Sequence, residues 1–103
     1  MNMPSLVVLV STHFRVAPES LAGAIGKQST VTARLTAMAL AEECGLGADM
    51  ACLLERPPGL ARYAVHWLKR RETASAPLKW QMEKLRAARN ALDWLTARRA
   101  RGG

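Results

Sequence analysis

Cysteines, aromatic residues and long apolar runs are all scarce in this sequence. Its two cysteines do not form a C-x-x-C pair, which argues against a disulfide framework. The apolar run at residues 6–10 is far shorter than the roughly 20 residues needed to span a bilayer. It is also too short for a secretory signal, and no Lys or Arg precedes it. We therefore expect a cytoplasmic protein without a membrane segment.

Recognisable catalytic patterns are missing as well. The sequence contains no carboxylate pair, no nucleophile with a matching base and no glycine-rich loop that would hold phosphate. Two histidines and two cysteines are present, but their spacing matches no standard set of zinc ligands; they are His13, Cys44, Cys52 and His66. We therefore expect no enzymatic activity, no cofactor and no bound metal.

Acidic residues are few, and the charge is unevenly distributed. Residues 1–55 hold three cations against five carboxylates, whereas residues 56–103 hold twelve cations against three carboxylates, which gives a net charge of +7. A basic half on a small protein attracts polyanions, because bound cations release the counterions condensed on them. The expected partner is duplex DNA or an acidic protein. The alternative is a solvated basic surface that only keeps the protein soluble.

Apolar periodicity predicts an all-α fold of four or five helices, with a helix-turn-helix-like corner and a long C-terminal helix, in a single domain spanning 1–103. Residues 1–18 are the exception, because their β-branched run predicts an extended arm or a short strand. Gly23 and Gly26 weaken the first expected helix. The expected helices are 19–33, 35–44, 47–55, 59–71 and 77–101, the last with a basic tail.

The expected C-terminal helix is apolar on two sides. One stripe is typical of a face packed on the core, and it consists of Leu78, Met82, Leu85, Leu92 and Leu95. The second stripe lies roughly opposite at 3.6 residues per turn and consists of Trp80, Ala87, Ala91 and Trp94. We expect this second stripe to form the interface of a homodimer. The alternative is a monomer whose other helices cover both sides.

Residues 35–55 contain the one motif with informative spacing. An apolar residue and a threonine open the motif, a Leu-Ala pair follows about four residues later, and a turn glycine comes four residues after that alanine. The matching positions are Leu35, Thr36, Leu40, Ala41, Gly45, Leu46, Ala51, Leu54 and Glu55. This pattern resembles the helix-turn-helix of DNA-binding regulators in the lambda repressor and Cro superfamily.

The resemblance implies a role for each of four residues at the corner. Ala41 is small where the second helix packs, Gly45 takes the left-handed turn, and Leu46 and Leu54 anchor the second helix. It also places Cys44 at a position that this motif buries, so we expect a buried thiol there. A plain helical corner with no DNA-binding role is the alternative interpretation.

The resemblance implies a small DNA-binding protein, such as a transcriptional regulator of phage or plasmid type. The second helix of the motif, 47–55, has no Arg, Lys, Asn or Gln to contact a base, and Asp49 would repel phosphate. Binding is therefore expected mainly through the DNA backbone. The cations expected to make these contacts are Arg34, Arg56, Arg62, Lys69 and Arg70.

A different class of function fits the same composition. The basic half would dock on an acidic protein, with Trp80 and Trp94 as the strongest contacts, as in an inhibitor or accessory subunit. Membrane binding is not expected, because the apolar stripe of the basic helix 59–71 is narrow and the core needs it.

Overall fold

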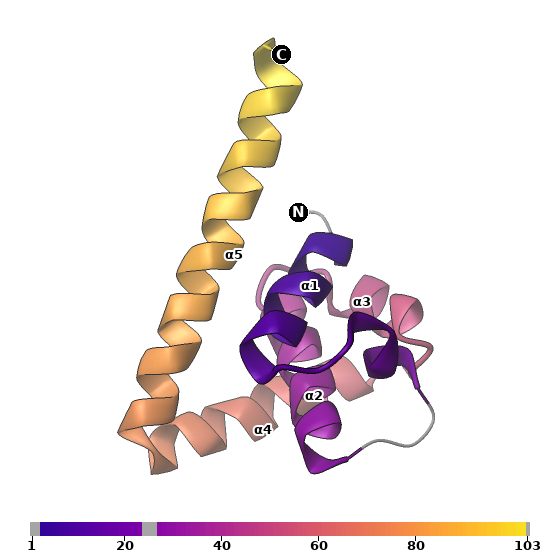
Figure 1. The fold of residues 1–103 in the computed structure, drawn as a ribbon, viewed down its shortest axis with the longest axis vertical. Coiled ribbons are helices and arrows are strands. Elements are labelled where there is room, and N and C mark those ends of the chain that lie inside the picture. The colour runs from indigo at the N-terminus through magenta and orange to yellow at the C-terminus, as the bar shows by residue number, and fades with distance from the viewer. Residues whose placement is uncertain (1–2, 24–26, 103) are drawn as a thin grey trace.

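The computed structural model describes residues 3–23 and 27–102, with side chains through Leu95 and at Arg98. The regular structure of the described residues is all helical, as the predicted all-α fold requires, and the chain ends in a long helix (Figure 1). The elements are α1 (Met3–Phe14), the 3-10 helix η1 (Pro18–Ala22), α2 (Gln28–Glu42), α3 (Gly47–Leu53), α4 (Leu60–Ala74) and α5 (Ala76–Gly102). None of these helices is both long enough and apolar enough to cross a membrane.

Helix α2 lies at the centre of the fold, and α1, α3, α4 and η1 all pack on it. Its second half is buried on every side from Thr36 to Ala41. Four of its core positions are alanines, whose small side chains let the surrounding helices come close: Ala33, Ala37, Ala39 and Ala41. The larger core side chains come mostly from the other elements, among them Leu6, Leu21, Met50 and Met82.

The N-terminal segment is a helix, so the predicted arm or strand over residues 1–18 is wrong. Leu6, Val7 and Val10 are buried, whereas Val8 is 53% exposed. This spacing follows one face of a helix and does not alternate as a strand would. A lone strand would leave its backbone groups without partners, but a helix satisfies them internally. Tertiary packing on α2 and α5 therefore overrides the β propensity of this segment.

The weak helix predicted over 19–33 is also wrong in its extent. The chain forms the short η1, and α2 begins only at Gln28 and continues without a break to Glu42. The predicted helix over 35–44 is thus the second half of one longer helix. Part of the segment between η1 and α2, residues 24–26, lies outside the described residues.

The first three α-helices end in the same way. In each, a residue with positive φ follows the helix, at Arg15 (φ 56°), Gly45 (φ 77°) and Glu55 (φ 57°). After α2, the Gly45 N–H donates to the Glu42 carbonyl and the Leu46 N–H donates to the Ala41 carbonyl, both at 2.9 Å. The same two bonds follow Arg15 and Glu55. This is the Schellman motif, and it confirms the predicted left-handed turn at Gly45.

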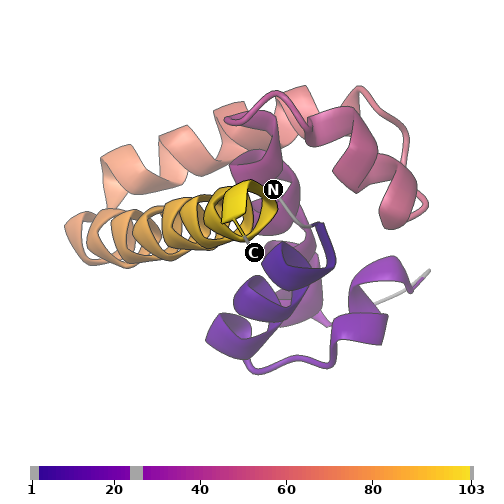
Figure 2. The same ribbon diagram turned by 90° about the horizontal axis from the view of Figure 1, so that it is seen from above.

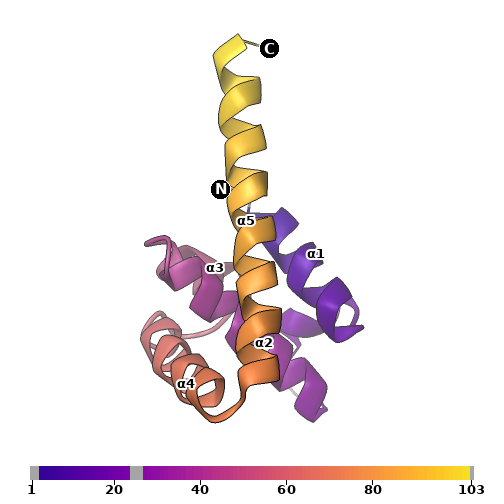
Figure 3. The ribbon, with the colours of Figure 1, turned by 90° about the vertical axis from the view of Figure 1, so that its left-hand side faces the viewer.

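A single residue joins α4 to α5. The backbone of Ser75 is extended, and its Oγ accepts a hydrogen bond from the Leu78 N–H at 3.3 Å. Ser75 is therefore the N-cap of α5. The first half of α5 packs between α4 and α1 (Figure 2), and its second half extends beyond the other helices (Figure 3).

A cluster of charged side chains fixes the direction of α5. Glu43, just past the end of α2, accepts hydrogen bonds from Arg86 at 2.9 Å and from Arg89 at 2.6 Å. Arg89 is buried and also donates to the Leu40 carbonyl, and Arg86 also pairs with Glu72 of α4. Burial raises the pKa of Glu43, but the hydrogen bonds from the two arginines outweigh burial and lower it.

Replacing the turn residues separates strain from packing. Gly45→Ala should lower the free energy of unfolding by about 1 kcal/mol, because a Cβ disfavours positive φ although the surrounding space is open. Glu55→Gly should raise it by about 0.5 kcal/mol, because glycine relieves the same strain. Gly59→Ala, at negative φ and also in open space, is the matched control and should not destabilise the protein. Urea unfolding measures all three, and equal effects of Gly45→Ala and Gly59→Ala would contradict the assignment.

Glu43→Gln tests the charged cluster. The variant should lose about 2 kcal/mol of stability near neutral pH, because two partly buried arginines lose a carboxylate partner. The folded-state pKa of Glu43 is lowered, so its contribution is complete above the unfolded-state pKa and is lost as pH falls through the folded value. Urea unfolding over a pH series should show the difference from wild type shrinking below about pH 4. A difference that does not change with pH would show that the charge of Glu43 is unimportant.

Candidate nucleic-acid interface

The corner between α2 and α3 has the packing that the sequence predicted. Ala41 and Leu54 are buried, and Leu46 is partly buried against the core. Gly47, the first residue of α3, fits closely against the next helix, since a Cβ there would lie 2.7 Å from the Ala61 Cβ. The start of α3 is therefore covered by α4 and by the Glu42 side chain, which lies at the same distance.

The outer face of α3 is not suited to contact bases. Its exposed residues are Ala48, Asp49, Cys52 and Leu53, and none of their side chains can donate a hydrogen bond to phosphate or to a guanine. Asp49 adds a negative charge. Cys44, expected as a buried thiol, is exposed. The Schellman turn is the reason, because it directs residue 44 away from the corner that Leu46 fills.

Arg34 was predicted to contact DNA, but it is an internal anchor. Its side chain is only 7% exposed, and Nε donates to the Leu21 carbonyl at 2.6 Å. One terminal nitrogen donates to the Gly23 carbonyl at 2.9 Å and also approaches the Ser20 carbonyl. Arg34 thus holds the end of η1 on α2. Burial, followed by repulsion from Arg56, lowers its pKa.

The Arg56 side chain also donates hydrogen bonds to backbone carbonyls. Its guanidinium donates to the Gly23 carbonyl, the same oxygen that Arg34 binds, and to the carbonyls of Leu54 and Glu55. Arg34 and Arg56 therefore bind backbone carbonyls in this structure and are not free surface cations as the prediction assumed. Both arginines donate to backbone carbonyls at the end of η1. The sequence pattern gives no signal that these carbonyls need a donor.

The other three predicted cations lie together on the exposed side of α4. Arg62, Lys69 and Arg70 are all exposed, whereas the opposite side of α4 is buried at Ala61, Ala64 and Leu68. Arg62, His66, Lys69 and Thr73 follow one another at helical spacing, so they form a line about 16 Å long at 1.5 Å per residue. We call these four residues, together with the neighbouring Arg70, the α4 basic line. A shallow hollow on the same face is lined by His66, Lys69, Arg70 and Thr73.

The cations of the α4 basic line have no carboxylate partner within the described ranges. The carboxylates near α4 are occupied, since Glu72 and Glu43 pair with arginines of α5. Arg71, on the other side of α4, lies over the Trp67 ring at 5.0 Å. Arg34, Arg56, Arg86 and Arg89 are therefore anchored within the fold, whereas the cations of the α4 basic line are free. Thr73 was missed as a member, although its helical spacing from Lys69 identifies it.

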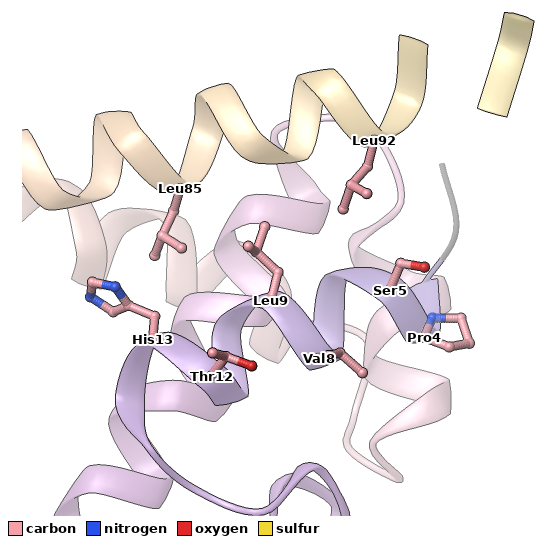
Figure 4. Close-up of a pocket in the computed structure, with 8 residues that line it drawn as sticks. All are labelled: Pro4, Ser5, Val8, Leu9, Thr12, His13, Leu85 and Leu92. Carbon is pink, nitrogen blue, oxygen red and sulfur yellow. The ribbon is translucent and has the colours of Figure 1, made fainter. Parts of the chain in front are cut away.

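A second surface feature lies between α1 and α5. It is an apolar groove of about 670 Å³. In Figure 4, Leu85 and Leu92 of α5 point toward α1, and Leu9 of α1 points back toward them. The rest of its lining consists of Pro4, Ser5, Val8, Thr12 and His13. Its side chains contain no arginine or lysine, so the groove does not have the chemistry of a phosphate site.

Comparison with known proteins identifies no relative. No family model matches the chain, and neither the curated proteins nor the solved structures include a significant match. The resemblance to helix-turn-helix regulators therefore stays a prediction, and the α4 basic line is the feature from which a function is argued.

Arg34→Met tests whether Arg34 is an anchor. The variant should lose about 2 kcal/mol of stability, because two well-formed hydrogen bonds from a charged donor disappear and buried carbonyls lose their partner. Arg62→Met, at an exposed position of the α4 basic line, should change stability by no more than about 0.5 kcal/mol. Thermal and urea unfolding of the two variants provide the comparison. Equal stability of the two would contradict the structural role of Arg34.

Proposed function

We propose that the protein binds duplex DNA through phosphate contacts made by the α4 basic line. The observation that supports this most directly is the row of exposed, unpaired cations on one side of α4. A flexible lysine and two arginines are usual protein groups at DNA phosphates, whereas the Thr73 hydroxyl donates to the Lys69 carbonyl. Their linear arrangement matches an extended polyanion better than a single small anion.

Binding is expected through the DNA backbone because α3 has no side chains suited to contact bases. In helix-turn-helix proteins the second helix of the motif enters the major groove and contacts base edges. Here that helix has seven residues, its first residue packs against α4, and its exposed face has no base-contacting donor. The corner in this protein instead positions α4, whose cations face outward. The expected binding is therefore strong at low salt and weakly dependent on DNA sequence.

A salt series measures the number of phosphate contacts. Binding of a fluorescent duplex, followed by anisotropy, should weaken linearly on a plot of log affinity against log salt concentration. Arg62→Ala and Lys69→Ala should each weaken binding and reduce the slope by about one unit, since each removes one phosphate contact. The double variant should reduce the slope by about two units.

Lys27→Ala is the matched control, because Lys27 is an exposed cation far along the chain, before α2. It should leave the slope unchanged, and an unrelated duplex of the same length should bind about as well as the first. Failure of the wild type to bind duplex DNA at low salt would overturn the proposal. Equal slopes for the Lys27 and Lys69 variants would show that net charge, and not the α4 basic line, drives binding.

A further inference from the structure

Helix α5 has an exposed stripe on the side opposite its packed face. Met82, Leu85 and Arg89 are buried against the other helices. Trp80 and Trp94 are each 59% exposed, and Ala87 and Ala91 between them are exposed as well. Within the described residues, this stripe faces no other element of the chain. Two large indoles in open solvent on one helix face are typical of an interaction surface.

The stripe has a regular period. With the cations Lys84 and Arg98 included, its members are Trp80, Lys84, Ala87, Ala91, Trp94 and Arg98. Successive spacings alternate between four and three residues, which is the heptad repeat of helices that pair with another helix. Each cation also contacts an indole of its own helix: Lys84 Nζ lies 3.7 Å from the Trp80 ring centre, and Arg98 Cζ lies 5.3 Å from that of Trp94.

The stripe is also complementary to the same stripe on a second, antiparallel copy of α5. When two copies of α5 are laid antiparallel about position 89, Trp80 faces Arg98 of the second copy, Lys84 faces Trp94, and Ala87 faces Ala91. Every cation then meets an indole, which is the favourable cation–π arrangement. In a parallel pair, Lys84 would face Lys84 and Arg98 would face Arg98, so like charges would meet at two layers.

We propose that a second copy of this chain binds along the α5 stripe, and that the two helices pair antiparallel about position 89. The small Ala87 and Ala91 let the helix axes approach at the centre. The indoles fill the space toward both ends, where crossing helices diverge. Glu83, exposed beside the stripe, places a carboxylate close to each group of two indoles and two cations.

The buried area is sufficient for a dimer of moderate affinity. Four indoles, each 59% exposed, would together bury about 600 Å², because a tryptophan contributes up to about 250 Å². A stable interface buries at least about 1,200 Å² in total. The two central alanines, the aliphatic parts of Lys84 and Arg98, and the half-exposed Leu95 supply the remainder. This pairing does not require DNA, so it is testable separately from the proposed function.

Sedimentation equilibrium of the full chain over a concentration series tests the pairing. The wild type should approach twice the mass of one chain. Trp80→Ala and Trp94→Ala should each weaken the dimer about tenfold or more, while circular dichroism shows the helices intact. Tyr63→Ala, which removes a half-exposed aromatic from α4, is the matched control and should leave the dimer unchanged. A wild type that remains monomeric, or Trp variants that associate as well as wild type, would overturn the proposal.

Disulfide trapping tests the orientation. Both native cysteines are exposed, so Cys44→Ser and Cys52→Ser provide a thiol-free background. In the antiparallel pair Gln81 of one copy lies beside Leu95 of the other. A mixture of the Gln81→Cys and Leu95→Cys proteins should therefore form the mixed disulfide, identified by mass spectrometry. A dimer that persists but forms no mixed disulfide between positions 81 and 95 would overturn the proposal. A dimer broken by Val8→Glu but not by the Trp variants would place the contact at the α1–α5 groove instead.

Discussion

Helix α2 is enclosed by its neighbours, and their arrangement depends on how little space its side chains occupy. A run of alanines lets α1, α3 and α4 pack on the same helix. Polar anchors stand at the two ends of this apolar segment. Arg34 holds the carbonyls of η1, and Glu43, just past the helix, holds two arginines of α5. Both anchors are partly or fully buried, where an unpaired charge is costly, so they fix the direction of each attached segment.

Some cations are bound inside the fold and others are exposed, and the exposed ones determine what the surface can bind. The basic half of the sequence does not produce a uniformly basic molecule, because several of its arginines are used inside the fold. The exposed cations of the α4 basic line have no carboxylate partner within the described residues, whereas Lys84 and Arg98 of α5 each lie over an indole. An arginine or lysine over an indole favours a protein partner, whereas a row of exposed, unpaired cations favours a polyanion. The two surfaces thus differ chemically although both are positively charged.

Much of the fold follows from local signals in the sequence. Gly45 and Ser75 mark a helix end and a helix start because their roles depend on a few neighbouring residues, and the length and two stripes of α5 follow from its 3.6-residue period. The sequence indicated the wrong environment for residues whose contacts lie far away along the chain. Arg34 and Arg56 look like surface cations because the carbonyls they bind belong to a segment more than ten residues earlier. Arg15 and Glu55 give no local signal of positive φ, because only the packing of the following segment requires it.

Helix α1 combines a helical structure with residues that favour strands. Its apolar run is held in the helix by α2 and α5, and its own preferences oppose that structure. If these contacts open, the released segment has high β propensity, no charge and no proline between residues 5 and 12. Such segments associate between molecules and form cross-β aggregates. Heating should therefore lead to precipitation faster than refolding on cooling, so the melting temperature would vary with scan rate and the protein's lifetime would be set kinetically.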